Sequence, residues 1–267
     1  MKKGICILLA AILLTGCVPV EETPETTQTI RWEMPSSPYV PEDFQQTDSF
    51  LSCSAGSVAV GIDVSSHQQQ IDWQAVKDAG IQYAFVRLSY RGYEQGTLNT
   101  DSFAIQNLNG AKDAGLLVGA YFFSQAVTVE EAREEALFAL DILDGMQLTL
   151  PLVYDWEYIN ETARTANMDR QTLTACTLAF CQEVEKAGYD AMIYFNSSQG
   201  RDLLELEKLE MYPWWLAKYD LEAEFLCRVD LWQYTNTGSV PGIRGNVDID
   251  LMFTDFGLGQ AVFGEME

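Results

Sequence analysis

Two acidic side chains end an otherwise apolar stretch of the sequence. In LPLVYDWEYIN, residues 150–160, Asp155 and Glu157 are separated by a tryptophan. Side chains alternate along a β-strand, so the two carboxyl groups face one side of it and Trp156 faces the other. A buried carboxylate is costly unless it is paired, hydrogen-bonded or protonated. The pattern therefore indicates either acid–base chemistry or a local role, in which the acids cap helices or bind a divalent cation.

Two further acids occupy comparable positions elsewhere. Asp63 ends the strand-like run SVAVGIDVS, and Asp248 lies in NVDID near the end of the chain. If all four carboxyl groups meet with no lysine beside them, their repulsion must raise the pKa of at least one. A protonated carboxylic acid beside an ionised one is what glycoside hydrolysis requires. Asp63, Asp155, Glu157 and Asp248 are therefore the predicted catalytic set.

The elements that carry these acids follow a repeated plan. Residues 77–89, 112–124 and 185–197 read KDAGIQYAFVRLS, KDAGLLVGAYFFS and EKAGYDAMIYFNS. Each begins with a charged helix end, continues with a glycine suited to a left-handed C-terminal cap, and ends in an apolar strand. Helices are predicted over residues 128–144, where Thr128 and Glu131 fit a capping box, and over residues 169–187.

Helices that alternate with strands apolar on both faces predict a parallel sheet covered by helices. About eight strands follow one another from IDVS to NVDIDLMF. We therefore expect an α/β fold, a single TIM-like (β/α) barrel that is irregular because little helix separates its last strands. A doubly wound open sheet is the alternative, but no G-x-G-x-x-G opens a helix after the first strand. Barrel enzymes build their sites at the C-terminal ends of the strands, and closure makes the first and last strands neighbours.

Aromatic residues also gather at the predicted strand ends. They are Tyr121, Trp156, Tyr194, Trp214, Trp215, Tyr219 and Trp232. Their ring faces suit sugar rings, although core packing is the other common role for rings at such positions.

The first residues predict export. Lys2 and Lys3 precede a short apolar stretch that ends in LTGC at Cys17, which is the pattern of a secretory signal too short to span a membrane comfortably. LTGC resembles a lipoprotein lipobox, in which the cysteine is lipidated; the alternative is an ordinary signal peptide. The predicted organisation is a signal peptide (1–16), an anchor cysteine and disordered linker rich in Pro, Thr and Glu (17–56), a barrel (57–258) and a C-terminal tail (259–267).

The net charge and the positions of the cysteines argue against some classes of protein. The net charge of -23 argues against nucleic acid as a partner, because binding it needs clustered Lys and Arg. No C-x-x-C occurs and His67 is the only histidine, so a structural zinc site is not expected. Chemistry carried out by carboxyl groups requires neither a metal nor a cofactor. The pairing of Cys53, Cys176, Cys181 and Cys227 stays open.

Several motifs, in order, resemble glycoside hydrolase family 25, the Chalaropsis-type lysozymes. They are GIDVSSHQQQIDW, AYFFSQA, LPLVYDWE, WWLAKY and LWQYTNTGSVPGIRGNVDIDLMF, and they run from about residue 60 to residue 253. The resemblance implies an irregular β/α barrel that hydrolyses the β-1,4 bond between N-acetylmuramic acid and N-acetylglucosamine in peptidoglycan. It maps the catalytic D-x-E of the family onto Asp155 and Glu157, and its other acids onto Asp63 and Asp248. Where the family often has a histidine, this chain has Phe122.

We therefore expect Glu157 to be the general acid and Asp155 to stabilise the substrate's 2-acetamido group as it attacks. Asp63 and Asp248 would tune the pKa of that pair and hold the sugar. Substrate contacts are expected from Tyr121, Trp156, Tyr194, Trp215, Tyr219, Trp232 and Gln233. The expected protein is a monomer outside the cytoplasm, held to the membrane only by lipid on Cys17.

Three other functions remain as alternatives. One is a non-catalytic wall-binding lipoprotein that keeps the cleft, although the four acids argue against it. The second is a thiol or serine hydrolase, which would have to use His67 as its base. The third is a chitinase of the D-x-x-D-x-D-x-E kind, but the earlier aspartates of that motif are missing before Glu157.

Overall fold

A computed structural model describes residues 32–219 and 227–264 of the chain. The chain divides into two units, Met1–Glu33 and Met34–Glu267, and all helices and strands given below belong to the second. The predicted signal peptide and Cys17 lie outside the described residues.

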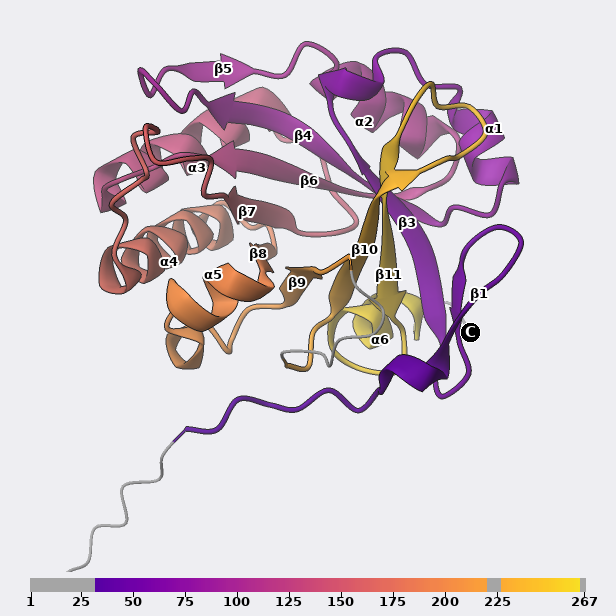
Figure 1. The fold of residues 1–267 in the computed structure, drawn as a ribbon. Helices are drawn as coiled ribbons and strands as arrows, with labels where there is room; N and C mark the ends of the chain where they lie inside the picture. The colour runs from indigo at the N-terminus through magenta and orange to yellow at the C-terminus, as the bar shows by residue number, and fades with distance from the viewer. Residues whose placement is uncertain (1–31, 220–226, 265–267) are drawn as a thin grey trace, which may run out of the picture. The chain divides into compact units, whose positions relative to one another are not determined.

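Eight strands of the described chain close into a barrel (Figure 1). They are β3 (Val58–Val64), β4 (Tyr83–Arg91), β6 (Leu117–Ser124), β7 (Leu152–Trp156), β8 (Ala191–Asn196), β9 (Trp214–Ala217), β10 (Leu231–Gly238) and β11 (Val247–Phe253). Strand β3 pairs with β4 on one side and with β11 on the other, which closes the ring. Strand β11 runs antiparallel to both of its neighbours, whereas the other barrel pairs are parallel. The irregular TIM-like barrel predicted from the sequence is confirmed.

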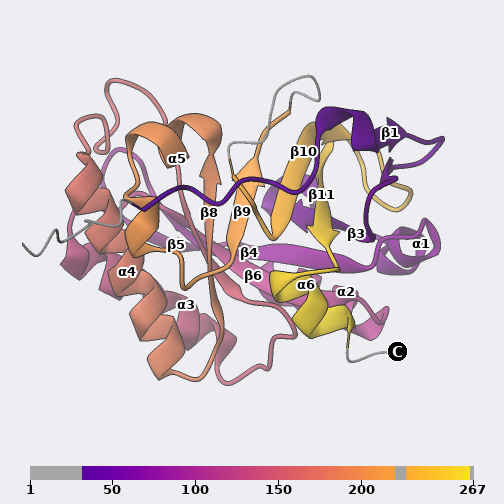
Figure 2. The same cartoon turned by 90° about the horizontal axis from the view of Figure 1, so that it is seen from below.

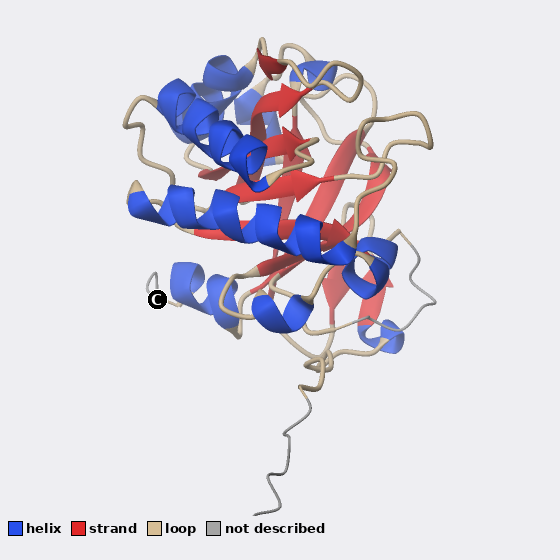
Figure 3. Cartoon of the chain, turned by 90° about the vertical axis from the view of Figure 1, so that its left-hand side faces the viewer, coloured by secondary structure: helices blue, strands red, loops and turns tan. Residues whose placement is uncertain are grey.

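Helices cover the outside of the strands (Figure 3). They are α1 (Trp73–Asp78), α2 (Ala104–Asp113), α3 (Val129–Leu143), α4 (Arg170–Lys186), α5 (Ser197–Asp202) and α6 (Gly257–Phe263). The N-caps of α3 and α4 are Thr128 and Asp169, whose side chains accept backbone N–H bonds. Both helices were predicted from the sequence, because capping and periodicity are local signals.

The N-terminal part of the second unit packs on the barrel. A short helical turn (Pro41–Asp43) leads into a hairpin of β1 (Phe44–Gln46) and β2 (Leu51–Cys53). Tyr39 stacks on Phe253 with ring centroids 4.7 Å apart, and Phe44 meets Trp232 edge-on at 5.0 Å. Burial of these apolar rings stabilises the segment. The packed unit therefore begins before residue 57, the boundary that the sequence predicted.

The C-terminal end also differs from the expected tail. Residue 259 lies inside α6, and Figures 1 and 2 both show this helix beside the end of β11. Leu258, Val262 and Phe263 of α6 pack against the core of the barrel. A tail with three apolar side chains at helical spacing gains free energy by covering the barrel in this way.

Large rings fill the barrel interior below the strand ends. Tyr83, Phe85 and Trp215 are buried there, and the rings of Phe85 and Trp215 lie 4.8 Å apart. Gly61 of β3 faces the Tyr83 ring so closely that a Cβ atom at residue 61 would overlap it. The interior is a packed floor, so a ligand can enter the barrel only at its mouth.

The four cysteines whose pairing the sequence left open are free in the structure: Cys53, Cys176, Cys181 and Cys227. Within residues 32–219 and 227–264, no helix combines the length and apolarity needed to cross a membrane.

Candidate active site

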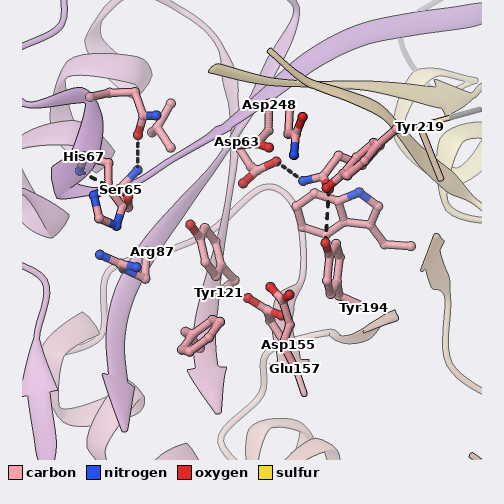
Figure 4. A pocket seen from close by; sticks show the side chains of 16 residues that line it. Asp63, Ser65, His67, Arg87, Tyr121, Asp155, Glu157, Tyr194, Tyr219 and Asp248 are labelled. Carbon is pink, nitrogen blue, oxygen red and sulfur yellow. Dashed lines mark hydrogen bonds between the residues drawn. The ribbon is translucent and has the colours of Figure 1, made fainter. Parts of the chain in front are cut away.

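Four acids converge at the mouth of the barrel. Asp63 lies at the C-terminal end of β3, and Asp155 and Glu157 lie at the end of β7 and just after it. Asp248 is near the start of β11, but this strand is antiparallel, so its start pairs with the end of β3 and Asp248 stands opposite Asp63. All four line one cavity of about 310 Å³, into which their side chains point (Figure 4). The convergence predicted from the sequence is present in the structure.

The cavity raises the pKa values of all four carboxyl groups. Burial, followed by repulsion from Asp248, raises the pKa of Glu157 to about 7. Burial also raises the pKa of Asp248 to about 6. The pKa values of Asp63 and Asp155 rise well above their ordinary range, through burial first and then through repulsion from neighbouring acids. Such a set can hold a transferable proton close to a negative charge.

Hydrogen bonds distinguish Asp63 from Asp155. Asp63 accepts a 2.6 Å hydrogen bond from Gln233 Nε2. This bond lowers the pKa of Asp63, but burial raises it by more. Gln233 Oε1 in turn accepts bonds from the hydroxyls of Tyr194 at 3.0 Å and Tyr219 at 2.7 Å. In contrast, Asp155 Oδ1 is buried without a hydrogen-bond partner among the described residues. Asp63 is held in position by Gln233, whereas one carboxyl oxygen of Asp155 is buried and has no partner among the described residues.

The expected substrate-contacting residues divide into two groups. The first group lines the cavity: Tyr121, Tyr194, Trp215, Tyr219 and Gln233.

The second group, Trp156 and Trp232, does not line the cavity. Trp156 is buried on the other face of β7, where its indole N–H donates to the carbonyl of Ala126 at 3.2 Å. The indole of Trp232 donates to the carbonyl of Lys218 at 2.7 Å. The side-chain alternation that turns Asp155 and Glu157 inward turns Trp156 outward, so its nearness in sequence to the acids does not bring it to them. Trp214, the remaining strand-end tryptophan, is also buried, and it donates to Leu209.

Sequence reasoning missed Arg87, which brings a positive charge into the cavity wall. Its guanidinium donates to Asp101 at 2.9 Å and to Ser66 Oγ at 3.3 Å, and it lowers the pKa of Asp155. The signal was an arginine inside the apolar run YAFVRLS of β4. A cation in such a strand indicates a buried acidic partner, and here that partner is Asp101.

His67 and Ser65 both line the cavity but do not form a nucleophile–base pair. The Ser65 hydroxyl oxygen accepts a bond from the backbone N–H of His67 at 3.2 Å, and the imidazole plays no part in it. A serine hydrolase needs the hydroxyl to donate to the imidazole. None of the described cysteines lines this cavity. The arrangement therefore gives no support to the hydrolase alternatives.

Phe122, which stands where the family often has a histidine, faces away from the cavity. Its ring is fully buried and lies 6.1 Å from the ring of Phe180 on α4, whereas the adjacent Phe123 lines the cavity. Among the described residues, no group of three or more His, Cys, Asp or Glu side chains has an arrangement that could hold a metal ion.

Two buried glutamines fix the backbone that carries the acids of β7. Gln125 Nε2 donates to the carbonyl oxygen of Glu157 at 2.7 Å, and Gln199 Nε2 donates to that of Trp156 at 2.7 Å. Both side chains are almost completely buried, with exposures of 0% and 2%. Because water does not compete for these bonds, they restrict the end of β7 and thereby the direction of the Glu157 side chain.

Comparison with known proteins identifies relatives of the barrel. The model of glycosyl hydrolases family 25 matches residues 62–243. The autolytic lysozyme of Clostridium acetobutylicum is 26% identical over 195 residues, which cover 71% of this chain and 54% of that protein. Lysozyme M1 of Streptomyces globisporus is 26% identical over 197 residues, which cover 70% of this chain and 65% of that protein.

Among solved structures, the modular autolysin LytC of Streptococcus pneumoniae in complex with a synthetic peptidoglycan ligand superposes with a TM-score of 0.63. The two are 26% identical, and the match covers 73% of this chain and 47% of LytC. The chain thus spans about half the length of LytC and of the Clostridium lysozyme.

Proposed function

The chain belongs to glycosyl hydrolase family 25, and on this premise we propose that it is a lysozyme. Its substrate is peptidoglycan, and it hydrolyses the β-1,4 bond between N-acetylmuramic acid and N-acetylglucosamine. The main support is the group of four acids at the barrel mouth, in which Glu157 has a pKa of about 7. Two relatives of the barrel carry the name lysozyme, and the LytC structure holds a peptidoglycan ligand.

The reaction begins with proton transfer from Glu157 to the glycosidic oxygen. As the bond from this oxygen to the anomeric carbon breaks, the carbonyl oxygen of the substrate's own 2-acetamido group bonds to that carbon. The carboxyl group of Asp155, which lines the cavity, accepts the acetamido N–H and stabilises the positive charge that develops there. Water then opens the cyclic intermediate, and the Glu157 carboxylate takes a proton from the attacking water.

Burial raises the pKa of both acids, and two neighbouring charges then act on the pair in opposite directions. Arg87 favours the ionised form of Asp155, whereas the charge of Asp248 favours the protonated form of Glu157. Asp63, tied to Gln233, lines the same cavity and holds the sugar. We assign the transferable proton to Glu157 and the contact with the acetamido group to Asp155, which is the division of roles that the mechanism needs.

The proposed activity is tested on purified, defined peptidoglycan. We expect the suspension to clear, and mass spectrometry to find fragments that end in reducing N-acetylmuramic acid. Fragments that end in reducing N-acetylglucosamine would indicate the opposite bond specificity. Binding to walls without any fragment release would support the alternative of a non-catalytic wall-binding protein.

Participation of the acetamido group predicts the stereochemistry of the product. Two successive displacements at the anomeric carbon return it to the β configuration. Proton NMR of the first product formed, recorded before the anomers equilibrate, is expected to show the β anomer. An initial α anomer would mean that water attacks directly, with Asp155 as its base.

We also propose that the protein acts outside the cytoplasm and is anchored by lipid on Cys17. The support is the sequence LTGC after a short apolar stretch. Acyl chains contribute about 0.8 kcal/mol per buried CH₂, so two or more hold a protein on a membrane stably. Expression of the full chain with a labelled fatty acid is expected to label the protein, and Cys17→Ala is expected to abolish the label. A label that persists in Cys17→Ala would refute the lipobox.

A further inference from the structure

A second depression lies beside the catalytic cavity, and we call it the side groove. It has a volume of about 700 Å³, and its lining includes Gln69, Gln70, Phe103, Gln106 and Arg244. The chain that passes along the catalytic cavity through His67 and Gln68 continues directly into this lining. One short helical turn (Ser66–Gln68) therefore separates the two sites.

The side groove lies on the side of the cavity that carries Arg87. Figure 4 shows His67 and Arg87 along one side of the cavity and Tyr194 and Tyr219 along the other. A ligand that extends from the four acids past His67 thus approaches the side groove.

The walls of the side groove are held by backbone contacts and by Gln68, which lies outside the lining, so the polar side chains of the lining are not used. The loop between β10 and β11 is tied to the start of α1, because the backbone N–H of Asp72 donates to the carbonyl of Gly242 at 2.9 Å. Gly242 has φ +94°, and a Cβ atom there would overlap the Asp72 carbonyl. Gln68 Nε2 donates to the carbonyl of Asn246 at 3.1 Å. The groove is therefore preformed by two loops that are fastened to each other.

Gln69 adds backbone strain to this wall. It has φ 54° although it is not glycine, and this left-handed conformation is unfavourable for a residue with a side chain. Such conformations cluster at ligand-binding positions, where the surrounding structure imposes them.

The unpaired charge in the side groove is positive. Arg244 is exposed and forms no ion pair within the described part of the chain, although the whole sequence has a net charge of -23. The acid in the lining is Asp72, whose carboxylate accepts the N–H of Ala75 at 3.1 Å as the N-cap of α1. A free guanidinium in so acidic a protein is suited to a carboxylate from outside the chain.

The other lining side chains suit a peptide. The amides of Gln69, Gln70 and Gln106 have no hydrogen-bond partners in the described structure, so they can donate to and accept from a peptide backbone. Phe103 supplies a half-buried ring for an apolar side chain. Together the lining offers one cation, several amides and one aromatic face.

From these observations we propose that the side groove binds the peptide stem of the muramic acid residue whose bond is cut, with Arg244 pairing with a stem carboxylate. This inference rests on the proposed lysozyme function. The separating turn has a rise of roughly 6 Å, at about 2 Å per residue. An extended peptide of four residues spans roughly 13 Å. A stem attached to the sugar in the cavity is therefore long enough to pass the turn and reach the groove.

The test compares one peptidoglycan preparation before and after an amidase has removed its stems. On stem-bearing strands, Arg244→Gln is expected to lower kcat/KM about three- to fivefold, the size of one exposed ion pair. On bare strands the variant is expected to match the wild type. Arg170→Gln is the matched control, because Arg170 is also exposed and unpaired but begins α4, on another side of the barrel (Figure 1). It is expected to change neither rate.

Each other outcome has a definite meaning. An equal loss on both substrates would mean that Arg244 attracts the anionic wall in general, and no loss on either would leave the groove without a role. Both outcomes overturn the inference.

If the wild type cleaves neither substrate, the lysozyme proposal fails, and binding of the isolated stem peptide then tests whether the groove binds a stem. Binding that is lost in Arg244→Gln and for a stem with amidated carboxylates supports it, and wild-type protein that does not bind the stem overturns it.

Discussion

Replacement of Glu157 with glutamine is expected to lower the rate of wall lysis by at least ~10²-fold, because glutamine keeps the shape of the side chain but has no proton to transfer. The pKa of about 7 also fixes the pH dependence of the wild type. The acid acts in its protonated form, so activity is expected to fall as the pH rises through about 7. The measurement is the initial rate of turbidity loss on one wall preparation, across a pH series.

Glu161→Gln is the matched control for this variant. Glu161 follows Glu157 in the same loop but is exposed and lies outside the cavity. Both substitutions remove one carboxyl group, so a difference in the rate of lysis between the two variants is due to the position of Glu157 in the cavity. Thermal unfolding of the two variants checks that each is folded. Near-normal lysis by Glu157→Gln would show that another group supplies the proton.

The barrel could be predicted because its signals are local. Each of residues 77–89, 112–124 and 185–197 carries a helix end, a glycine and an apolar strand within 13 residues. The glycines of these segments, Gly80, Gly115 and Gly188, all have positive φ in the structure. The convergence of the acids followed from the same pattern, because strand ends in a closed barrel meet at one mouth.

The remaining features depend on contacts between distant parts of the chain. Gln125 reaches the end of β7 from the loop after β6, and Gln199 reaches it from the first turn of α5. The hairpin at residues 44–53 looked like linker because its strands are three residues each, and it gains its order from packing on Trp232 and Phe253. Periodicity shows which residues share a face of a strand, but not which of them reach the cavity.

Periodicity does not distinguish Asp248 from Asp250, but the structure places them at different depths in the barrel. Both face the same side of β11, because they are two residues apart. Asp248 is half-buried, lines the cavity and stands opposite Asp63. Asp250 pairs with Gly61 one step deeper, is completely buried, and accepts a 3.0 Å bond from the indole N–H of Trp215. Only Asp248 is among the groups whose charge raises the pKa of Glu157.

Asp248→Asn is therefore expected to have a large effect and Asp250→Asn a small one. Loss of the Asp248 charge lowers the pKa of Glu157, so less of the acid is protonated at neutral pH and the alkaline limb of the pH profile moves to lower pH. A decrease of about one pKa unit corresponds to roughly a tenfold loss of activity above that pKa. Burial raises the pKa of Asp250 well above its ordinary range, and asparagine at this position keeps an acceptor for the indole N–H of Trp215. We expect Asp250→Asn to stay within about twofold of the wild type with an unmoved alkaline limb, since Asp250 is not among the groups that raise the pKa of Glu157. Rate–pH profiles of both variants on one wall preparation test this ranking, and the reverse order would identify Asp250 as the residue that tunes the catalytic acid.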